Sequence, residues 1–214
     1  MNGACWRGVL TLLVLVGAAG CGGTVTTGGA GGGSAAPQEV KRDETSMARP
    51  QSGGELEFSV TRVFEAPVEE VYRAWVDPEL VMRWWGPMGF TSPMARMDVR
   101  VGGASLVCMR APKEFGGQDW YNTWTYQKVE PGRRLEFISR FADAEGNELD
   151  PAAMGLPPGI PRETPQVVTF VSAGENRTEM TVTEYGYTSE QAIALSKGGL
   201  EQCLDKMAAI FAAE

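Results

Sequence analysis

Hydrophobic and polar side chains alternate along residues 55–64. A repeat of two residues is typical of a β-strand with one buried face. Apolar residues then recur at helical spacing over 68–75, with acidic residues in the first turn, and this pattern predicts a helix. Asp77-Pro78 is typical of an N-cap followed by a proline at the first helical position. We therefore expect a second short helix, which ends at Trp84-Trp85-Gly86-Pro87.

Six further strands are predicted in the next part of the chain, arranged as three hairpins. Each hairpin is indicated by two strand-like runs around a turn sequence that contains glycine. The predicted strands cover residues 90–101 and 104–110, 120–129 and 133–141, and 166–172 and 178–185. Residues 143–164 between them are rich in proline and glycine and have no periodicity. A loop of this length in a compact domain is usually a lid or an interaction surface.

A long helix is predicted over residues 189–213, with Ser189 as its cap. Its apolar side chains form one stripe along the helix, made of Ile193, Leu200, Leu204, Met207 and Phe211. Leu195, Cys203 and Ile210 flank this stripe. Gly198-Gly199 interrupts this helix, and each glycine costs about 1 kcal/mol relative to alanine. We therefore expect that a strand, a bound molecule or a bend needs room there.

The order of elements predicts the fold class. One strand, two short helices, six hairpin-connected strands and a long helix indicate an α+β domain. The strands form a curved antiparallel sheet of about seven strands, which the two short helices are too small to cover. The sheet is therefore expected to wrap around the long C-terminal helix.

The first 20 residues have the features of a secretory signal peptide. Arg7 precedes the apolar run 9–16, which is too short for the ~20 residues that span a bilayer, and small residues follow up to Cys21. This sequence resembles a bacterial lipobox, in which the cysteine is acylated and becomes the first mature residue. The resemblance implies attachment to a membrane through acylated Cys21, in the bacterial cell envelope. An uncleaved anchor and plain secretion remain alternatives.

Residues 21–54 form a segment rich in glycine, serine and threonine, without aromatic residues or periodicity. Such a segment buries too little apolar surface to offset its ordering entropy, so we expect a disordered tether. A flexible linker of this length has an r.m.s. span of about 30 Å. The folded domain is therefore expected to comprise residues 55–214.

The amino-acid composition of the chain argues against several classes of function. The chain has 27 acidic and 19 basic residues, a formal net charge of -8, which argues against nucleic-acid binding. It contains no histidine, and its 4 cysteines include no Cys-x-x-Cys pair. Histidine-based nucleophilic catalysis and most transition-metal sites are thereby excluded. We expect no cofactor and no metal.

Several residues are candidates for a binding site. Trp120, Asn122, Trp124 and Tyr126 share one face of a predicted strand, where they form either the wall of a cavity or packed core. Methionine suits adaptable apolar pockets as well as simple packing. Strand methionines at 97, 109 and 180 are therefore open to both interpretations.

Acid–base chemistry has three candidates, Glu184, Tyr126 and Arg140, if their side chains point inward. Their spacing does not pair them, so no catalytic set is assigned. Cys108 and Cys203 are the thiols that remain after processing, and a disulfide between them requires Cα atoms within ~7 Å. Two buried free thiols are the prediction.

These motifs, in this order, resemble the START-like helix-grip superfamily, and within it the homologues of the heat-shock-protein ATPase activator and the polyketide cyclases. The matching segments are Thr61–Pro67, Val71–Pro78, Trp84–Pro87, Asp98–Gly103, Val129–Phe137 and Gly199–Met207. The resemblance covers essentially the whole folded domain. It implies a cavity between the sheet and the long helix that holds an apolar or aromatic small molecule.

We therefore expect non-catalytic binding of a hydrophobic small molecule by a membrane-tethered lipoprotein. The expected cavity residues are Trp85, Met97, Met109, Trp120, Trp124, Tyr126, Phe137, Phe170, Met180, Leu195, Gly199 and Cys203. One alternative is an enzyme of the cyclase or dehydratase type, which requires two inward ionisable or hydroxyl groups at one point of the cavity. Another is a protein-interaction module that uses the 143–164 loop.

Overall fold

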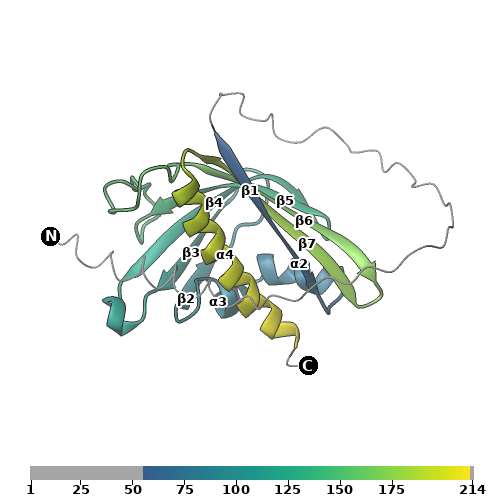
Figure 1. The fold of residues 1–214 in the computed structure, drawn as a ribbon. Helices are drawn as coiled ribbons and strands as arrows, with labels where there is room; N and C mark the ends of the chain where they lie inside the picture. The colour runs from purple at the N-terminus through teal and green to yellow at the C-terminus, as the bar shows by residue number, and fades with distance from the viewer. Residues whose placement is uncertain (1–54, 213–214) are drawn as a thin grey trace, which may run out of the picture.

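A computed structural model describes residues 55–212 of the chain. These residues form a seven-stranded antiparallel sheet with the strand order β1-β7-β6-β5-β4-β3-β2 (Figure 1). The strands are β1 (Leu56–Phe64), β2 (Thr91–Arg96), β3 (Ala104–Arg110), β4 (Asp119–Glu130), β5 (Arg134–Ala142), β6 (Thr164–Gly174) and β7 (Arg177–Tyr187). The helices are α2 (Val68–Val76), α3 (Pro78–Trp84), the short 3-10 helix η1 (Lys113–Phe115) and α4 (Glu190–Phe211).

The sheet curves around α4, which runs across the strands on the concave side (Figure 1). The helices α2 and α3 follow β1 and lie at one end of the sheet. This arrangement confirms the predicted α+β fold, its strand number and its long terminal helix. In residues 55–212, no helix combines the length and apolar character needed to cross a bilayer.

The predicted helix caps are present. The Asp77 carboxylate accepts a hydrogen bond from the Glu79 amide at 2.9 Å, which starts α3 directly before Pro78. Ser189 accepts one from the Ala192 amide at 3.2 Å at the start of α4. Each cap satisfies an amide that has no partner within its own helix, so these boundaries follow from local sequence.

Aromatic side chains fill the centre of the core. The Trp75 ring lies 4.8 Å from that of Trp84 and 5.9 Å from that of Trp124, measured between centroids. The Trp84 Nε1–H donates to the carbonyl of Ala74 at 2.8 Å, and that of Trp75 donates to the Met180 sulfur at 3.1 Å. Trp84 therefore fixes α3 against α2 and the sheet.

The segment before β3 differs from the prediction. The strand expected over 90–101 ends at Arg96, because the chain turns tightly between Asp98 and Gly103. The Gly103 amide donates to the carbonyl of Arg100 at 2.7 Å. A Cβ atom on Gly103 would lie 2.3 Å from the Asp98 carbonyl oxygen, far inside van der Waals contact. The turn therefore requires glycine at 103.

The long connection between β5 and β6 is tied down by ion pairs. Arg140 pairs with Glu163 at 2.6 Å. Arg162 pairs with Glu148 at 3.3 Å and with Asp150 at 3.1 Å. These contacts link the two ends of the connection to its middle, so it is a folded part of the domain.

The two cysteines of the domain, Cys108 and Cys203, are buried free thiols, as predicted. Cys203 faces the concave side of the sheet from α4. Cys108 precedes Met109, which also faces that side, so the alternation along β3 directs Cys108 to the opposite face. The signal peptide, Cys21 and the tether lie outside the described residues.

Candidate functional site

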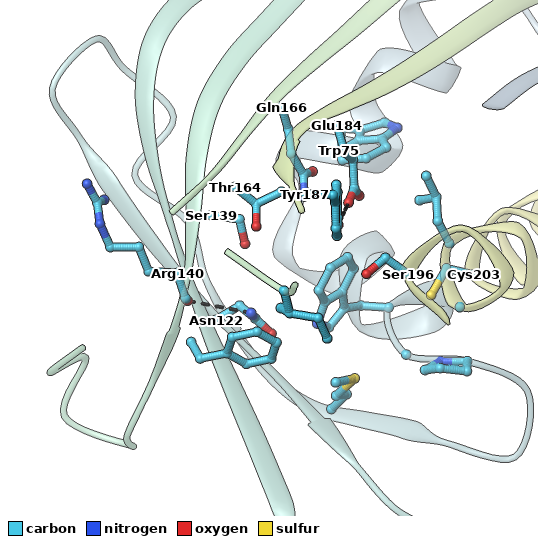
Figure 2. Close-up of a pocket in the computed structure, with 18 residues that line it drawn as sticks. Trp75, Asn122, Ser139, Arg140, Thr164, Gln166, Glu184, Tyr187, Ser196 and Cys203 are labelled. Carbon is cyan, nitrogen blue, oxygen red and sulfur yellow. Dashed lines mark hydrogen bonds between the residues drawn. The ribbon is translucent and has the colours of Figure 1, made fainter. Parts of the chain in front are cut away.

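A cavity of about 160 Å³ lies between the concave face of the sheet and α4. The lining residues lie on the strands β3 to β7, on α2, on α4 and in two loops, and Figure 2 shows the labelled side chains around this space. The lining residues are Trp75, Trp85, Gly86, Pro87, Met109, Asn122, Ser139, Arg140, Phe141, Ile160, Thr164, Gln166, Glu184, Tyr187, Ser196, Gly199, Leu200 and Cys203.

One wall of the cavity is a row of polar side chains across the sheet, which we call the polar row. It consists of Asn122 on β4, Ser139 on β5, Thr164 and Gln166 on β6, and Glu184 on β7. In the strand register, Ser139 lies opposite Thr164, and Gln166 lies opposite Glu184. Each residue is more than nine-tenths buried, although polar groups in this position normally require hydrogen-bond partners.

Three members of the polar row lack such partners. Within residues 55–212, the side chains of Ser139, Thr164 and Gln166 make no hydrogen bond to the protein, and all three point toward the same space (Figure 2). Asn122 has one long contact, from its Nδ2 to the carbonyl of Arg140 at 3.5 Å. The row therefore presents hydroxyl and amide groups that are available to a bound molecule.

Glu184 and Tyr187 form a buried pair at the end of the row. The Tyr187 hydroxyl donates to Oε2 of Glu184 at 2.5 Å (Figure 2). Burial raises the pKa of Glu184 to about 7, although the hydrogen bond from Tyr187 opposes this shift. Burial and the neighbouring carboxylate also raise the pKa of Tyr187. Glu184 is thus the member of the pair that changes its charge near neutral pH.

Most of the remaining lining is apolar, although Ser196 on α4 adds one hydroxyl (Figure 2). Trp75 and Trp85 contribute rings, and Ile160 and Leu200 contribute aliphatic side chains. The Trp85 ring meets that of Trp124 edge to face, with centroids 4.9 Å apart. The Trp85 Nε1–H is buried and has no hydrogen-bond partner in residues 55–212. The cavity therefore has one side suited to rings and one side suited to hydrogen bonds.

The loop between α3 and β2, residues 85–90, borders the cavity and is held by α4. The Lys206 ammonium donates to the carbonyl of Gly86 at 2.8 Å and to that of Phe90 at 3.0 Å. One turn earlier, the Gln202 side chain accepts a hydrogen bond from the Met88 amide at 3.0 Å. Burial lowers the pKa of Lys206. The helix thereby fixes both the loop and the cavity wall.

Four of the expected cavity residues, Trp85, Met109, Gly199 and Cys203, line the cavity. Burial raises the pKa of the Cys203 thiol to about 12, so it stays protonated. The pKa of this thiol makes it a neutral wall residue rather than a nucleophile.

The other expected cavity residues lie elsewhere. Several belong to the packed core: Trp124, Tyr126, Phe137, Phe170 and Met180. Met97 packs against that core, Trp120 is buried outside the lining, and Leu195 is half-buried on α4 without reaching the cavity. The core residues of this set do point to the concave face of the sheet, as expected. However, α2, α3 and the side chains around them fill that part of the concave face, so no cavity remains there.

The acid–base candidates separate in the same way. Glu184 lines the cavity, whereas the Tyr126 hydroxyl lies in the core at 3.1 Å from Ser105 Oγ. The Arg140 side chain turns away to pair with Glu163 (Figure 2).

Sequence reasoning named Asn122 and Glu184 of the polar row but missed Ser139, Thr164 and Gln166, and it missed Tyr187. The available signal was the alternation along β6, where Thr164 and Gln166 share a face with Val168 and Phe170. Polar residues on the inward face of a strand indicate either a satisfied network or a binding surface.

No curated protein matches the chain. Among solved structures, a protein from Arthrobacter aurescens is 27% identical with a TM-score of 0.61, over 74% of this chain and 87% of the other. A protein from Chromobacterium violaceum is 24% identical with a TM-score of 0.58, over 73% and 97%. The AHSA1 protein from Silicibacter pomeroyi is 17% identical with a TM-score of 0.57, over 74% and 99%, and shares the fold.

A family of sequences covers the same region. The family described as "Activator of Hsp90 ATPase homolog 1-like protein" matches residues 65–212, from the end of β1 to the end of α4. This span includes the polar row, the apolar wall and the loop at 85–90. The chain belongs to the family of proteins like the activator of Hsp90 ATPase homolog 1.

Proposed function

We propose that the protein binds a hydrophobic or aromatic small molecule in the cavity between the sheet and α4. The observation that carries this proposal is the partly open pocket itself, which is lined by tryptophan and aliphatic side chains as well as polar ones. Sites of this kind obtain affinity from apolar burial and orientation from a few polar groups. Ligand binding is also common among START-like domains, the fold to which this one corresponds.

The size of the cavity restricts the ligand. An apolar cavity of about 150 Å³ in a protein core is large enough to bind benzene. A space of about 160 Å³ therefore suits a molecule of about one ring. A larger guest would extend out through the opening of the pocket.

The test is to fill the cavity from Gly199. A leucine at this position on α4 would project into the space, and it also has a better helix propensity by about 1 kcal/mol. Gly199→Leu should lower the affinity for an apolar fluorescent dye at least tenfold without lowering the melting temperature. Ala209→Leu, at an exposed position of the same helix, is the matched control and should leave dye binding unchanged. Equal dye binding by both variants would refute the proposal.

Native mass spectrometry addresses the natural ligand. Protein purified from its own membrane should release an apolar compound on denaturation. Repeated extraction without any compound, together with no dye binding, would contradict a carrier role.

We also propose that the domain is anchored to a membrane of the bacterial envelope through acylated Cys21. The support is the lipobox-like end of the signal sequence and the polar segment between Cys21 and the domain. Cys21→Ser should move the protein from the membrane fraction to the soluble fraction. Unchanged fractionation would exclude acylation as the anchor.

A second candidate function is proton-transfer catalysis of the cyclase or dehydratase type. It is favoured by one observation, the pair of Glu184 and Tyr187 at the cavity wall with a carboxyl pKa of about 7. An ionised Glu184 would take an α-proton from a ring ketone and return a deuteron from D2O. Cyclohexanone should then exchange its α-protons faster with the protein than with Glu184→Gln, as followed by NMR. Equal exchange would argue against catalysis.

The protein-interaction alternative gains little support. It requires an exposed apolar patch, and the large exposed hydrophobic residues in the described part of the chain are Val63, Met88, Val101 and Val171. They lie on four separate segments, and Glu179 stands between Val63 and Val171 in the strand register.

A further inference from the structure

The proposed function leaves the chemical class of the ligand open, and the polar row defines it. Resting on that function, we propose that the ligand is a neutral molecule of about one ring that carries a carbonyl, amide or hydroxyl group bound by Ser139, Thr164, Gln166 and Glu184. The expected guest is therefore polar at one end, in contrast to a purely hydrocarbon one.

The first argument is the unused hydrogen-bonding capacity of the wall. Gln166 offers two amide donors and a carbonyl acceptor, and the hydroxyls of Ser139 and Thr164 can donate or accept. All three side chains are more than nine-tenths buried and have no partner within residues 55–212. Their polar atoms face the open space of the cavity, where either water or a polar group of a bound molecule can pair with them. This wall therefore favours a ligand that carries such a group.

The second argument is position. The register places Gln166 beside Glu184 and Ser139 beside Thr164, on three adjacent strands. The four side chains therefore converge on one area of the wall rather than being dispersed around the cavity (Figure 2). One carbonyl, amide or hydroxyl substituent can reach more than one of them at once. A pure hydrocarbon would give Ser139, Thr164 and Gln166 no hydrogen-bond partner.

The third argument is charge. An anionic ligand would meet Glu184 without a compensating cation, because Arg140 is directed to Glu163 and Lys206 donates to backbone carbonyls. Tyr187 also directs its hydroxyl to Glu184. A cationic ligand would need an ionised Glu184, which burial disfavours below about pH 7. A neutral ligand avoids both penalties.

The fourth argument is the apolar part of the lining. Trp85 and Leu200 face the space from the 85–90 loop and from α4, and neither carries charge. A ring that lies against them directs a single substituent toward the sheet. The cavity of about 160 Å³ leaves little room for a second ring.

Four ring compounds of similar size test this inference: benzamide, toluene, benzoate and benzylamine. Their affinities for the purified full-length protein are measured at pH 6 by calorimetry. Among the polar probes, benzamide should bind at least tenfold more tightly than benzoate and benzylamine. Toluene serves as the reference for apolar burial, which contributes to all four.

The decisive variant is Gln166→Leu, which keeps the side-chain size and removes the amide. The ratio of the benzamide Kd to the toluene Kd should rise about tenfold, because a site that hydrogen-bonds a polar group discriminates by this amount or more. Gln127→Leu, the same change at an exposed position of β4, is the matched control and should leave the ratio unchanged. If Gln166→Leu does not fold, as judged by circular dichroism, Thr164→Val provides the same comparison.

The outcomes separate the two proposals. Binding of toluene and benzamide with a ratio that neither variant changes would overturn the polar-row assignment and leave the cavity as a hydrophobic site. Tighter binding of benzoate or benzylamine would overturn the assignment to neutral ligands. Failure of all four compounds to bind would overturn both this inference and the proposed function.

Discussion

Replacing Glu184 by glutamine removes an ionisable carboxyl from the cavity wall while keeping its shape. The pKa of this group is raised from 4.5 to about 7 in the folded protein, because burial disfavours the charged form. Between these two values the folded protein binds more protons than the unfolded chain does. The free energy of unfolding therefore falls as the pH rises through this range.

The magnitude follows from the size of the shift. Each pKa unit corresponds to 1.36 kcal/mol, so the wild-type protein should lose about 3 kcal/mol of stability from this group between low pH and pH 8. The contribution is complete below about pH 4.5 and is lost as the pH passes 7. Glu184→Gln has no such titration, and its amide oxygen can still accept the hydrogen bond from Tyr187. The variant should therefore be the more stable protein at pH 8.

Urea unfolding of both proteins at several pH values between 5 and 8.5 measures this difference. The free-energy gap should grow by about 3 kcal/mol across the range, almost linearly between pH 5 and 7 and only slightly above pH 7. A gap of that size corresponds to about 6–12 °C in melting temperature. The aspartates with lowered pKa values, Asp77, Asp119 and Asp143, titrate below this range in both proteins.

Glu179→Gln is the matched control, since Glu179 lies on β7 at an exposed position. Its gap to the wild type should stay within about 0.5 kcal/mol at every pH. A constant gap for Glu184→Gln across the range would refute the assignment of a raised carboxyl pKa.

Further predictions concern the turn before β3, the 85–90 loop and the thiols. Gly103→Ala should lower the free energy of unfolding by several kcal/mol, because its Cβ would overlap a backbone oxygen. Gly102→Ala should cost only about 1 kcal/mol, because the space around it is open and only φ is strained. Urea unfolding of both variants measures the difference. Lys206→Met removes the hydrogen bonds to the 85–90 loop and should increase tryptophan quenching by acrylamide, with an unchanged rate excluding this role for the amine. Cys108 and Cys203 should react with a thiol reagent only after denaturant is added, and rapid labelling of the native protein would contradict their burial.

The fold followed from local patterns that act within a few residues. The cap at Asp77 and the cap at Ser189 each depend on one side chain and an adjacent amide, so sequence identifies them directly. The alternation along β4 likewise assigned Trp124 and Tyr126 to a buried face. These elements need no knowledge of the rest of the chain.

The site was less predictable, because its location depends on where α4 and the short helices lie on the concave face. Trp124 and Asn122 share one face of β4, yet Trp124 is packed among core rings and Asn122 lines the cavity. The two positions are only two residues apart along β4, and this distance separates the packed core from the cavity. Local periodicity gives the face of a strand but not the height at which a helix covers it.

The contacts of Lys206 and Gln202 with the 85–90 loop affect how fast a guest can leave the cavity. Both side chains hold the same loop, which borders the space where a guest would sit. Departure past this loop therefore requires several hydrogen bonds between α4 side chains and the loop backbone to open together. The dissociation rate of a guest and the hydrogen–deuterium exchange of the Met88 amide should then rise in parallel whenever the contact is weakened. The residence time of a guest would then be controlled by these contacts between α4 and the loop, separately from the affinity, which the residues lining the cavity determine.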